Sequence, residues 1–451
     1  MFTGKKYVIL SAIVAGLGGL LFGFDTAVIA GTTKTLQELF NLDASKLGLT
    51  VSIALWGTMI GALVSGIPGD VWGRRFCLKI TGVLFFVSAV GCAFSWDWHS
   101  LVVFRFIGGL GVGAASVLGP MYIAEIAPAR LRGRFVGIFQ FNIVFGILLA
   151  YFSNYMIGLY NLGMLEWRVK LGIEALPALA FLALLLFIPL SPRWLVKKAR
   201  TEEAMAVLEA IDPKNAKTEL DEILNSIKTN KAQKNIRLFS KKHSFPIFLA
   251  ISIALFNQLS GINALLYYLN DIFAMAGFSK VSGDVQAVII GGTNLLFTII
   301  AMSVIDKLGR KPLLLTGAVG TTICLAGVAA IFLSNTHQDL LIWFLVGYIA
   351  FFAFSQGAVI WVYLSEIFPN TVRAKGQALG SFTHWFMCAL ITWTFPIMAA
   401  KSGGYPFVFF AAMMVIQFFV TLFFYPETKG DSLEELQKRL LSNEEQAAHT
   451  A

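Results

Sequence analysis

Charged residues and cysteines are scarce in this chain of 451 residues. Lys, Arg, Asp and Glu make up 14% of it, whereas soluble domains carry nearer a quarter. The four cysteines have no metal-like spacing and indicate neither a redox compartment nor a chemistry. The sequence also contains no Walker phosphate loop, metal cluster or nucleophile–base pair. A membrane-bound enzyme is therefore disfavoured, and neither a cofactor nor a metal is expected.

Long apolar runs dominate the chain, which is 57% hydrophobic. Runs of about 18 or more apolar residues are candidates for membrane helices. Twelve such runs are present, at approximately 7–31, 47–69, 76–95, 100–125, 134–158, 167–190, 244–274, 283–305, 312–334, 339–367, 376–400 and 404–425. The first run is longer than the apolar region of a signal peptide, so we expect it to stay in the mature protein. The sequence predicts an all-α polytopic membrane protein with twelve transmembrane helices.

Positive charge is concentrated in alternate loops. Of the 35 Lys and Arg residues, 28 lie in the loops on one predicted side, six lie on the other, and Arg105 lies inside a span. By the positive-inside rule this distribution puts both termini in the cytoplasm. The net charge of +9 is therefore a topology signal, and we expect no nucleic-acid partner.

Two sequence motifs occur twice in the chain. "GDVWGRR" at 69–75 is echoed by "IDKLGRKP" at 305–312, and "YIAEIAPARLRGR" at 122–134 is echoed by "YLSEIFPNTVRAK" at 363–375. The nearly constant offset, at matching spans, predicts a six-helix unit that is present twice with parallel topology.

Between the repeats lies one substantial polar stretch. In "TEEAMAVLEAID" and "KTELDEILNSIK" the apolar residues recur at helical spacing, with Pro213 between them. We expect two short amphipathic helices against the cytoplasmic face. The predicted organisation is an N-terminal six-helix half at 1–192, a cytoplasmic linker at 193–243, a C-terminal half at 244–427 and a cytoplasmic tail at 428–451.

The chain resembles the sugar porter family of the major facilitator superfamily. The resemblance rests on the two D-x-x-G-R-R/K loops, "SPRWL" at 191–195 and "YPETKG" at 425–430, and it covers nearly the whole chain. Within the family the sequence is most similar to bacterial xylose–proton symporters and related hexose carriers. This resemblance implies a major facilitator fold and the import of a monosaccharide, either a pentose or a hexose, by alternating access.

Two opposite charges share a depth in the first half. Asp25 is about 9 Å below the outer end of the first span, and Arg105 is about 7.5 Å below the same end of the fourth. We expect them to be the only carboxylate and guanidinium well inside this half. Such residues are functional by default, which favours Asp25 as a proton site modulated by Arg105 over a static salt bridge. The resemblance agrees, because proton-coupled sugar porters carry Asp here and passive animal facilitators commonly have Asn.

Further charges gather at the cytoplasmic ends of the helices. Simple anchoring at helix ends would explain them, since exposed pairs are weak. The family resemblance and the repetition in both halves favour an ion-pair gate that opens and closes with the two halves. The residues assigned to this gate are Asp70, Arg74, Arg75, Glu125, Arg132, Asp306, Arg310, Glu366 and Arg373.

A sugar carrier needs amides for the hydroxyls and aromatic faces for the ring. Several candidates lie at mid-depth, although any single Asn or Gln is equally explained by an interhelical hydrogen bond. Ser260 and Gly261 are expected to break the seventh span. By residue type, depth or resemblance, the predicted sugar-binding residues are Phe22, Gln140, Asn257, Gln258, Asn263, Tyr267, Asn294, Trp361, His384 and Trp385.

Four departures from the family pattern bear on the choice of sugar. Asn257 stands where the xylose-type pattern has Gln, His384 replaces a sugar-contacting Gln, and Ile147 replaces a polar residue. "SQGAVIW" at 355–361 lacks the usual proline. His384 is interpreted as a sugar donor or acceptor, with a second pH-sensitive group as the alternative.

The predicted function is proton-coupled monosaccharide symport by a monomer in a lipid bilayer. A bacterial inner membrane is the expected location. The alternatives are a passive facilitator and a membrane sugar sensor that does not transport. The glycines of "GGLGVG" at 108–113 are interpreted as helix-packing residues and not as a nucleotide loop.

Overall fold

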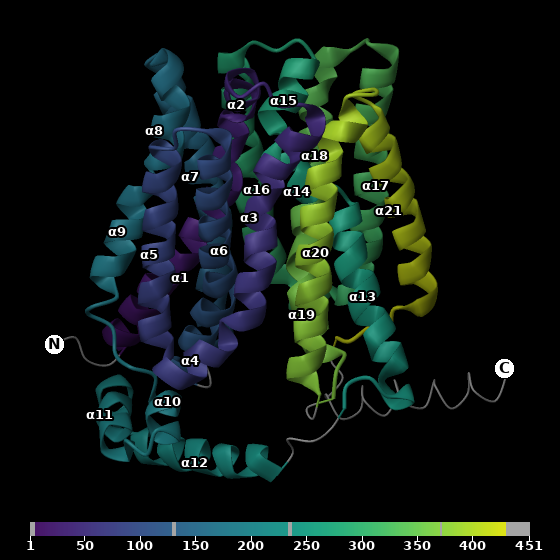
Figure 1. The fold of residues 1–451 in the computed structure, drawn as a ribbon. Helices are drawn as coiled ribbons and strands as arrows, with labels where there is room; N and C mark the ends of the chain where they lie inside the picture. The colour runs from purple at the N-terminus through teal and green to yellow at the C-terminus, as the bar shows by residue number, and fades with distance from the viewer. Residues whose placement is uncertain (1–4, 129–131, 233–236, 370–371, 430–451) are drawn as a thin grey trace. The chain divides into compact units, whose positions relative to one another are not determined.

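The computed structural model describes residues 5–128, 132–232, 237–369 and 372–429. Within these ranges the regular secondary structure is helical throughout (Figure 1). Eleven helical segments of the described ranges are long and apolar enough to cross a membrane. The all-α polytopic prediction is confirmed.

Nine of these segments are continuous helices. They are α1 (Lys5–Val28), α3 (Ala44–Val64), α5 (Arg74–Ala93), α6 (Trp98–Ile126), α7 (Arg132–Leu159), α16 (Lys280–Leu308), α17 (Arg310–Ser334), α20 (Arg373–Ala399) and α21 (Tyr405–Phe424). Short helices lie between them: α2 (Thr33–Leu39) and α4 (Gly66–Trp72).

Two segments are broken near the middle. The predicted break of the seventh span is present: α13 (Ser244–Leu259) ends before Gly261, which has φ +85°, and α14 (Ile262–Tyr267) and α15 (Leu269–Met275) follow. The hydroxyl of Tyr348 donates to the Ser260 carbonyl that the break frees, at 2.9 Å. The second break lies at Ser355, between α18 (Leu341–Phe354) and α19 (Gln356–Glu366).

The sixth predicted span, 167–190, is wrong as a single helix. The chain forms α8 (Glu166–Gly172) and α9 (Ala175–Leu184) with a turn at Ile173 and Glu174. Pro177 accounts for the turn, because a proline ring clashes with the carbonyl four residues earlier, here that of Ile173. The apolar run is continuous, but the backbone that carries it is not.

The chain divides into two compact units, and each has its own apolar core. The first comprises residues 1–41 and 53–234, and the second comprises residues 42–52 and 235–451. In the first, α1 packs against α6 and α7, and α5 packs against α6, α8 and α9. In the second, α17 packs against α18 and α21, and α13 packs against α20.

Small residues permit close packing in the first unit. A Cβ on Gly109 would lie 1.9 Å from the Ala54 carbonyl oxygen, and one on Gly113 would lie 2.1 Å from that of Thr58. Both glycines therefore let α6 touch the backbone of α3. The helix-packing interpretation of "GGLGVG" is confirmed.

The linker contains the two predicted amphipathic helices, α11 (Thr201–Ile211) and α12 (Ala216–Ala232), and a short α10 (Pro192–Lys197) that was not predicted. Trp194, Leu208 and Ile223 share a small apolar core there. Ile211 belongs to the core of the first unit together with Tyr7, which fixes α11 at the end of α1 (Figure 1). The predicted tail lies outside the described residues from 430 onward.

Candidate functional site

A buried ion pair lies inside the first unit. The Arg105 Nη1 atom donates to Asp25 Oδ1 at 2.8 Å, and the two residues are 1% and 4% exposed. The position of Arg105 follows from the start of α6, where Asp97 and Ser100 form a capping box. The Ser100 amide donates to Asp97 Oδ1 at 2.8 Å and lowers the pKa of the Asp97 carboxyl. The predicted shared depth of the two charges thus brings them into direct contact.

A second carboxylate is buried beside this pair, which corrects the expectation of a single one. Glu174, at the turn between α8 and α9, is 3% exposed, and its charge acts on both Asp25 and Arg105. Among the described residues, its Oε1 atom has no hydrogen-bond partner. Two carboxylates therefore lie within the electrostatic range of one guanidinium. The sequence signal was present, because Glu174 lies inside the sixth apolar run.

The C-terminal end of α1 is fixed by side chains from other helices. The Asn154 amide donates to the Val28 carbonyl at 3.0 Å, and Lys170 Nζ donates to the Gly31 carbonyl at 3.1 Å. Lys170 is fully buried and lies 2.7 Å from Glu166 Oε1. A helix end needs such partners for its last carbonyls. These contacts hold the segment that carries Asp25, and Lys170 is not an exposed loop charge.

In the second unit a neutral polar cluster lies beside the break in the seventh span. Gln258 is its centre: its Oε1 accepts from Asn263 Nδ2 at 2.9 Å, and its Nε2 donates to Asn257 Oδ1 at 3.1 Å. The same Nε2 lies 3.2 and 3.3 Å from the ring nitrogens of His384. The break places Asn263 back over Gln258, which a straight helix would not do. Four predicted residues are thus brought together.

Aromatic rings lie beside this cluster. The rings of Trp361 and His384 are 5.0 Å apart, and Trp385 meets His384 edge-on, also at 5.0 Å. Trp361 is 38% exposed, whereas Trp385 and Tyr267 are buried. Rings and amides therefore lie side by side, which is the combination that a sugar ring and its hydroxyls require.

The remaining sugar-binding candidates lie in other helices. Asn294 is buried in α16. Phe22 in α1 and Gln140 in α7 are partly buried and belong to the first unit, where Phe22 packs against the apolar core.

Gln356 was missed by sequence reasoning. It begins α19 directly after the break at Ser355, and its backbone carbonyl lies 3.4 Å from Asn257 Nδ2. The side chain is 1% exposed, and its Oε1 atom has no partner among the described residues. The sequence signal for this residue was its polarity: in "SQGAVIW" the Gln follows a serine inside an apolar run.

The ion-pair network of the first unit is centred on Arg74. Its Nη2 atom lies 2.8 Å from Asp70 Oδ1 and 2.9 Å from Glu125 Oε1. Ser191 donates to Glu125, and Lys197 lies 3.1 Å from Asp70. Although partial burial opposes ionisation of Asp70, the hydrogen bond from Lys197 and the charge of Arg74 hold the pKa of that carboxyl below its usual range.

The network of the second unit also pairs an arginine with a glutamate. A threonine hydroxyl and a second glutamate complete it. Arg310 binds Glu366 through two contacts of 2.7 and 3.2 Å, and Thr428 donates to Glu366 at 2.6 Å. The carboxylate of Glu427 accepts from the backbone amides of Arg310 and Lys311 at the start of α17, at 2.9 and 3.0 Å.

Other predicted gate residues have different surroundings. Arg75 donates to the carbonyls of Leu185 and Leu186, at 2.9 and 2.7 Å, and so caps the end of α9. Arg373 donates to the Phe368 carbonyl at 3.2 Å. The side chains of Arg132 and Asp306 lie outside the described residues.

Comparison with known proteins gives the same relatives by sequence and by structure. The family model described as "Sugar (and other) transporter" matches residues 11–440. The D-xylose-proton symporter of Escherichia coli K12 is 38% identical, with 96% of each chain covered. The arabinose-proton symporter of Bacillus subtilis 168 is 37% identical, with 96% of this chain and 95% of that protein covered.

Solved structures extend the likeness to the fold. The inward-open xylose transporter of E. coli gives a TM-score of 0.86 at 38% identity, over 96% of this chain and 100% of that one. A proton:xylose symporter of the major facilitator superfamily, bound to 6-bromo-6-deoxy-D-glucose, gives a TM-score of 0.80 at 37% identity, over 97% and 100%.

Proposed function

This chain belongs to the sugar transporter family of the major facilitator superfamily, and from that premise we propose that it imports a monosaccharide together with a proton. The family consists of transporters and not of enzymes. The named relatives are symporters of xylose and arabinose, so the substrate we infer is a pentose or a hexose. The carrier works in a bacterial inner membrane, as a monomer surrounded by lipid.

The buried pair of Asp25 and Arg105 carries the proposal of coupling. A nearby cation favours a charged carboxylate, and burial without one favours the protonated form. A movement that separates Arg105 from Asp25 therefore makes Asp25 take up a proton, and their return makes it release one. Glu174 offers Arg105 a second carboxylate when Arg105 leaves Asp25, whose negative charge is then neutralised by the proton that Asp25 takes up.

Sugar recognition is proposed for the neutral cluster. Asn257, Gln258, Asn263 and His384 offer donors and acceptors whose positions are already fixed by mutual hydrogen bonds. Sugar hydroxyls replace some of these bonds, and the rings of Trp361 and Trp385 cover the apolar face of the sugar. Phe22, Gln140, Tyr267 and Asn294 remain proposed contacts.

The proposed topology has both termini in the cytoplasm, with functional halves at 1–192 and 244–427, the linker at 193–243 and the tail at 428–451. The two Arg-centred networks lie at the cytoplasmic ends of the helices and act as the gate. Breaking and remaking them accompanies alternating access.

Vesicle uptake tests the proposal. Purified protein in sealed vesicles is offered a panel of labelled pentoses and hexoses, with and without an imposed inward proton gradient. We expect at least one sugar to accumulate above equilibrium only with the gradient. Equilibration at the same level in both conditions would identify a passive facilitator, and no flux of any sugar would favour a sensor.

A further inference from the structure

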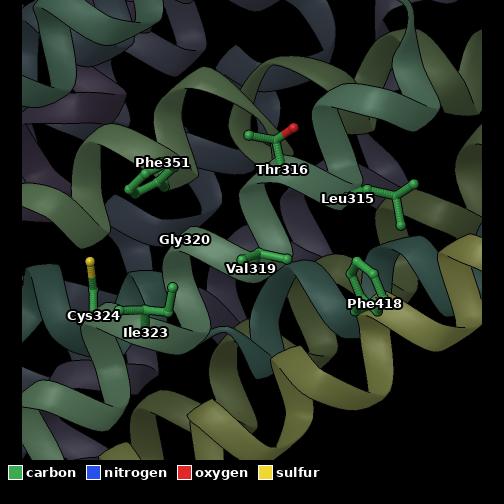
Figure 2. A pocket seen from close by; sticks show the side chains of 8 residues that line it. All are labelled: Leu315, Thr316, Val319, Gly320, Ile323, Cys324, Phe351 and Phe418. Carbon is green, nitrogen blue, oxygen red and sulfur yellow. The ribbon is translucent and has the colours of Figure 1, made fainter.

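An apolar groove lies on the surface of the second unit, away from the polar cluster. Its volume is about 450 Å³, and α17 forms most of it, with one ring from α18 and one from α21. Figure 2 shows Phe351 and Cys324 at one end and Leu315 and Phe418 at the other. The groove is built by packing, because a Cβ on Gly320 would lie 2.2 Å from the ring of Phe351.

The rim of the groove is exposed and apolar. Val319 and Ile323 are 46% and 62% exposed, although they lie in the middle of a membrane-spanning helix. The hydroxyl of Thr316 is already satisfied by the Pro312 carbonyl at 2.9 Å. No lining group therefore calls for water, and inside a bilayer such a surface contacts hydrocarbon.

Cations gather at one end of the groove. Lys311 is one helical turn before Leu315, and its Nζ donates to the Leu422 carbonyl of α21 at 2.8 Å. The exposed side chain of Lys429 donates from Nζ to the Lys307 carbonyl. The neighbouring carboxylate, Glu427, is occupied by the backbone amides of Arg310 and Lys311. The ammonium groups thus exceed the acids at the point where α17 leaves the membrane.

From these observations we propose that the groove binds one acyl chain of an anionic phospholipid, whose phosphate lies against Lys311. The groove runs from Leu315 to Cys324, about 13.5 Å of helix at 1.5 Å per residue, so it follows the direction of a lipid chain. Basic pockets between membrane helices on the cytoplasmic side are known to favour anionic headgroups. This inference does not depend on sugar transport.

Native mass spectrometry of the delipidated, full-length protein tests the proposal. The protein is titrated with dioleoyl phosphatidylglycerol and, separately, with dioleoyl phosphatidylcholine. We expect one phosphatidylglycerol to bind with a preference of about fivefold over phosphatidylcholine, the contribution of one lysine near an anionic group. Equal binding of both lipids to the wild-type protein would overturn the proposed preference for an anionic headgroup.

Two variants test the acyl-chain contact and the headgroup contact separately. Val319→Trp places a large ring in the groove and is expected to remove the bound lipid of either kind. Lys311→Gln keeps a donor for Leu422 and is expected to keep one lipid while losing the preference for phosphatidylglycerol. The matched controls are Val103→Trp, an exposed apolar site on α6, and Lys214→Gln in the linker, and both should behave as wild type.

Retention of the same lipid by Val319→Trp would overturn the proposal that the groove binds the acyl chain. A dimer that forms through the groove and excludes lipid would also overturn it. If Val319→Trp does not fold, Ile323→Trp at the more exposed rim provides a second test. Its fluorescence should be quenched by brominated phosphatidylglycerol more strongly than that of Val103→Trp. Equal quenching of the two would contradict the proposal.

Discussion

The two candidate sites differ in chemistry: the one in the first half is built from ionisable residues, whereas the one in the second half is built from amides and an imidazole. Asp25, Arg105 and Glu174 form the first group, and the cluster around Gln258 forms the second. The two halves repeat the same sequence plan, so this difference is a division of labour. The proposed proton chemistry belongs to the first half, and most of the proposed sugar contacts belong to the second, with Phe22 and Gln140 added from the first.

A second difference lies at the helix ends that are predicted to face the cytoplasm. Gly73 and Gly309 occupy equivalent turns with φ +94° in both halves. A Cβ on Gly73 would meet the ring of Trp194, at 3.0 Å, whereas one on Gly309 would meet the carboxylate of Glu427, at 2.7 Å. The repeat therefore conserves the backbone turn and changes what covers it, an indole in one half and a helix-capping acid in the other.

Asp25→Asn should have the largest effect, because it removes the titratable group without changing its size. Moving one charge inward is worth about 2.3 kcal/mol per 100 mV, and accumulation driven by it should vanish. Exchange of labelled for unlabelled sugar should continue. Asp43→Asn, at an exposed helix cap, is the matched control and should accumulate sugar normally. Persistent accumulation by Asp25→Asn would reject the assignment to the first half.

Gln258→Ala should weaken sugar binding and leave coupling intact. Its removal strips Asn263 and His384 of a partner and costs about 1–3 kcal/mol, or roughly tenfold to a hundredfold in affinity. Binding is measured by sugar-dependent thermal stabilisation, and coupling by the ratio of sugar to proton flux. Gln286→Leu, an amide near the outer end of α16, serves as the control. A changed flux ratio with normal affinity would contradict the proposed division.

Arg74→Gln and Arg310→Gln compare the two cytoplasmic networks directly. Arg74 contacts two carboxylates, Asp70 and Glu125, whereas Arg310 pairs with Glu366. We expect the melting temperature to fall by a few degrees in both, about 2–4 °C per kcal/mol lost, and further in Arg74→Gln. A larger loss in Arg310→Gln would show that Glu427 and Thr428 outweigh the second acid.

Glu427→Gln should have the smallest effect, and its effect should depend on pH. Partial burial opposes ionisation, but the amides of Arg310, Lys429 and Lys311 outweigh it and hold the pKa of Glu427 below 4.5, its ordinary value. The stabilisation is therefore present above pH 4.5 and is lost as the pH falls through the lowered pKa.

For this variant we expect a melting temperature about 1–4 °C below wild type at pH 6, because charges at helix ends contribute 0.3–1 kcal/mol. The gap should close under acid conditions, below the ordinary pKa. A gap that is independent of pH would mean that Glu427 acts through shape and not through charge.

The spans and the broken seventh helix were predictable because both depend on local sequence. Apolar run length sets the first, and the freedom of Gly261 sets the second. The Asp25–Arg105 pair was predictable from depth, since helical rise converts sequence distance into height in the membrane. The split of the sixth span into α8 and α9 was also encoded locally, by Pro177. The prediction missed it because the apolar run is continuous across the split.

The surroundings of individual side chains could not be predicted, because they depend on which helices pack together. Glu174 meets Arg105 from another helix, and Arg75 caps α9 where an ion pair was expected. Lys170, near the start of the sixth apolar run, is buried against Glu166 and the end of α1. Spacing along the sequence does not specify such neighbours.

Proton flux accompanying downhill sugar entry tests the central claim most directly. Vesicles in weak buffer receive a transported sugar while a pH electrode follows the medium. The wild-type protein should alkalinise the medium in step with sugar entry. Asp25→Asn should admit sugar without alkalinisation. Proton uptake at the wild-type ratio in Asp25→Asn would contradict the account.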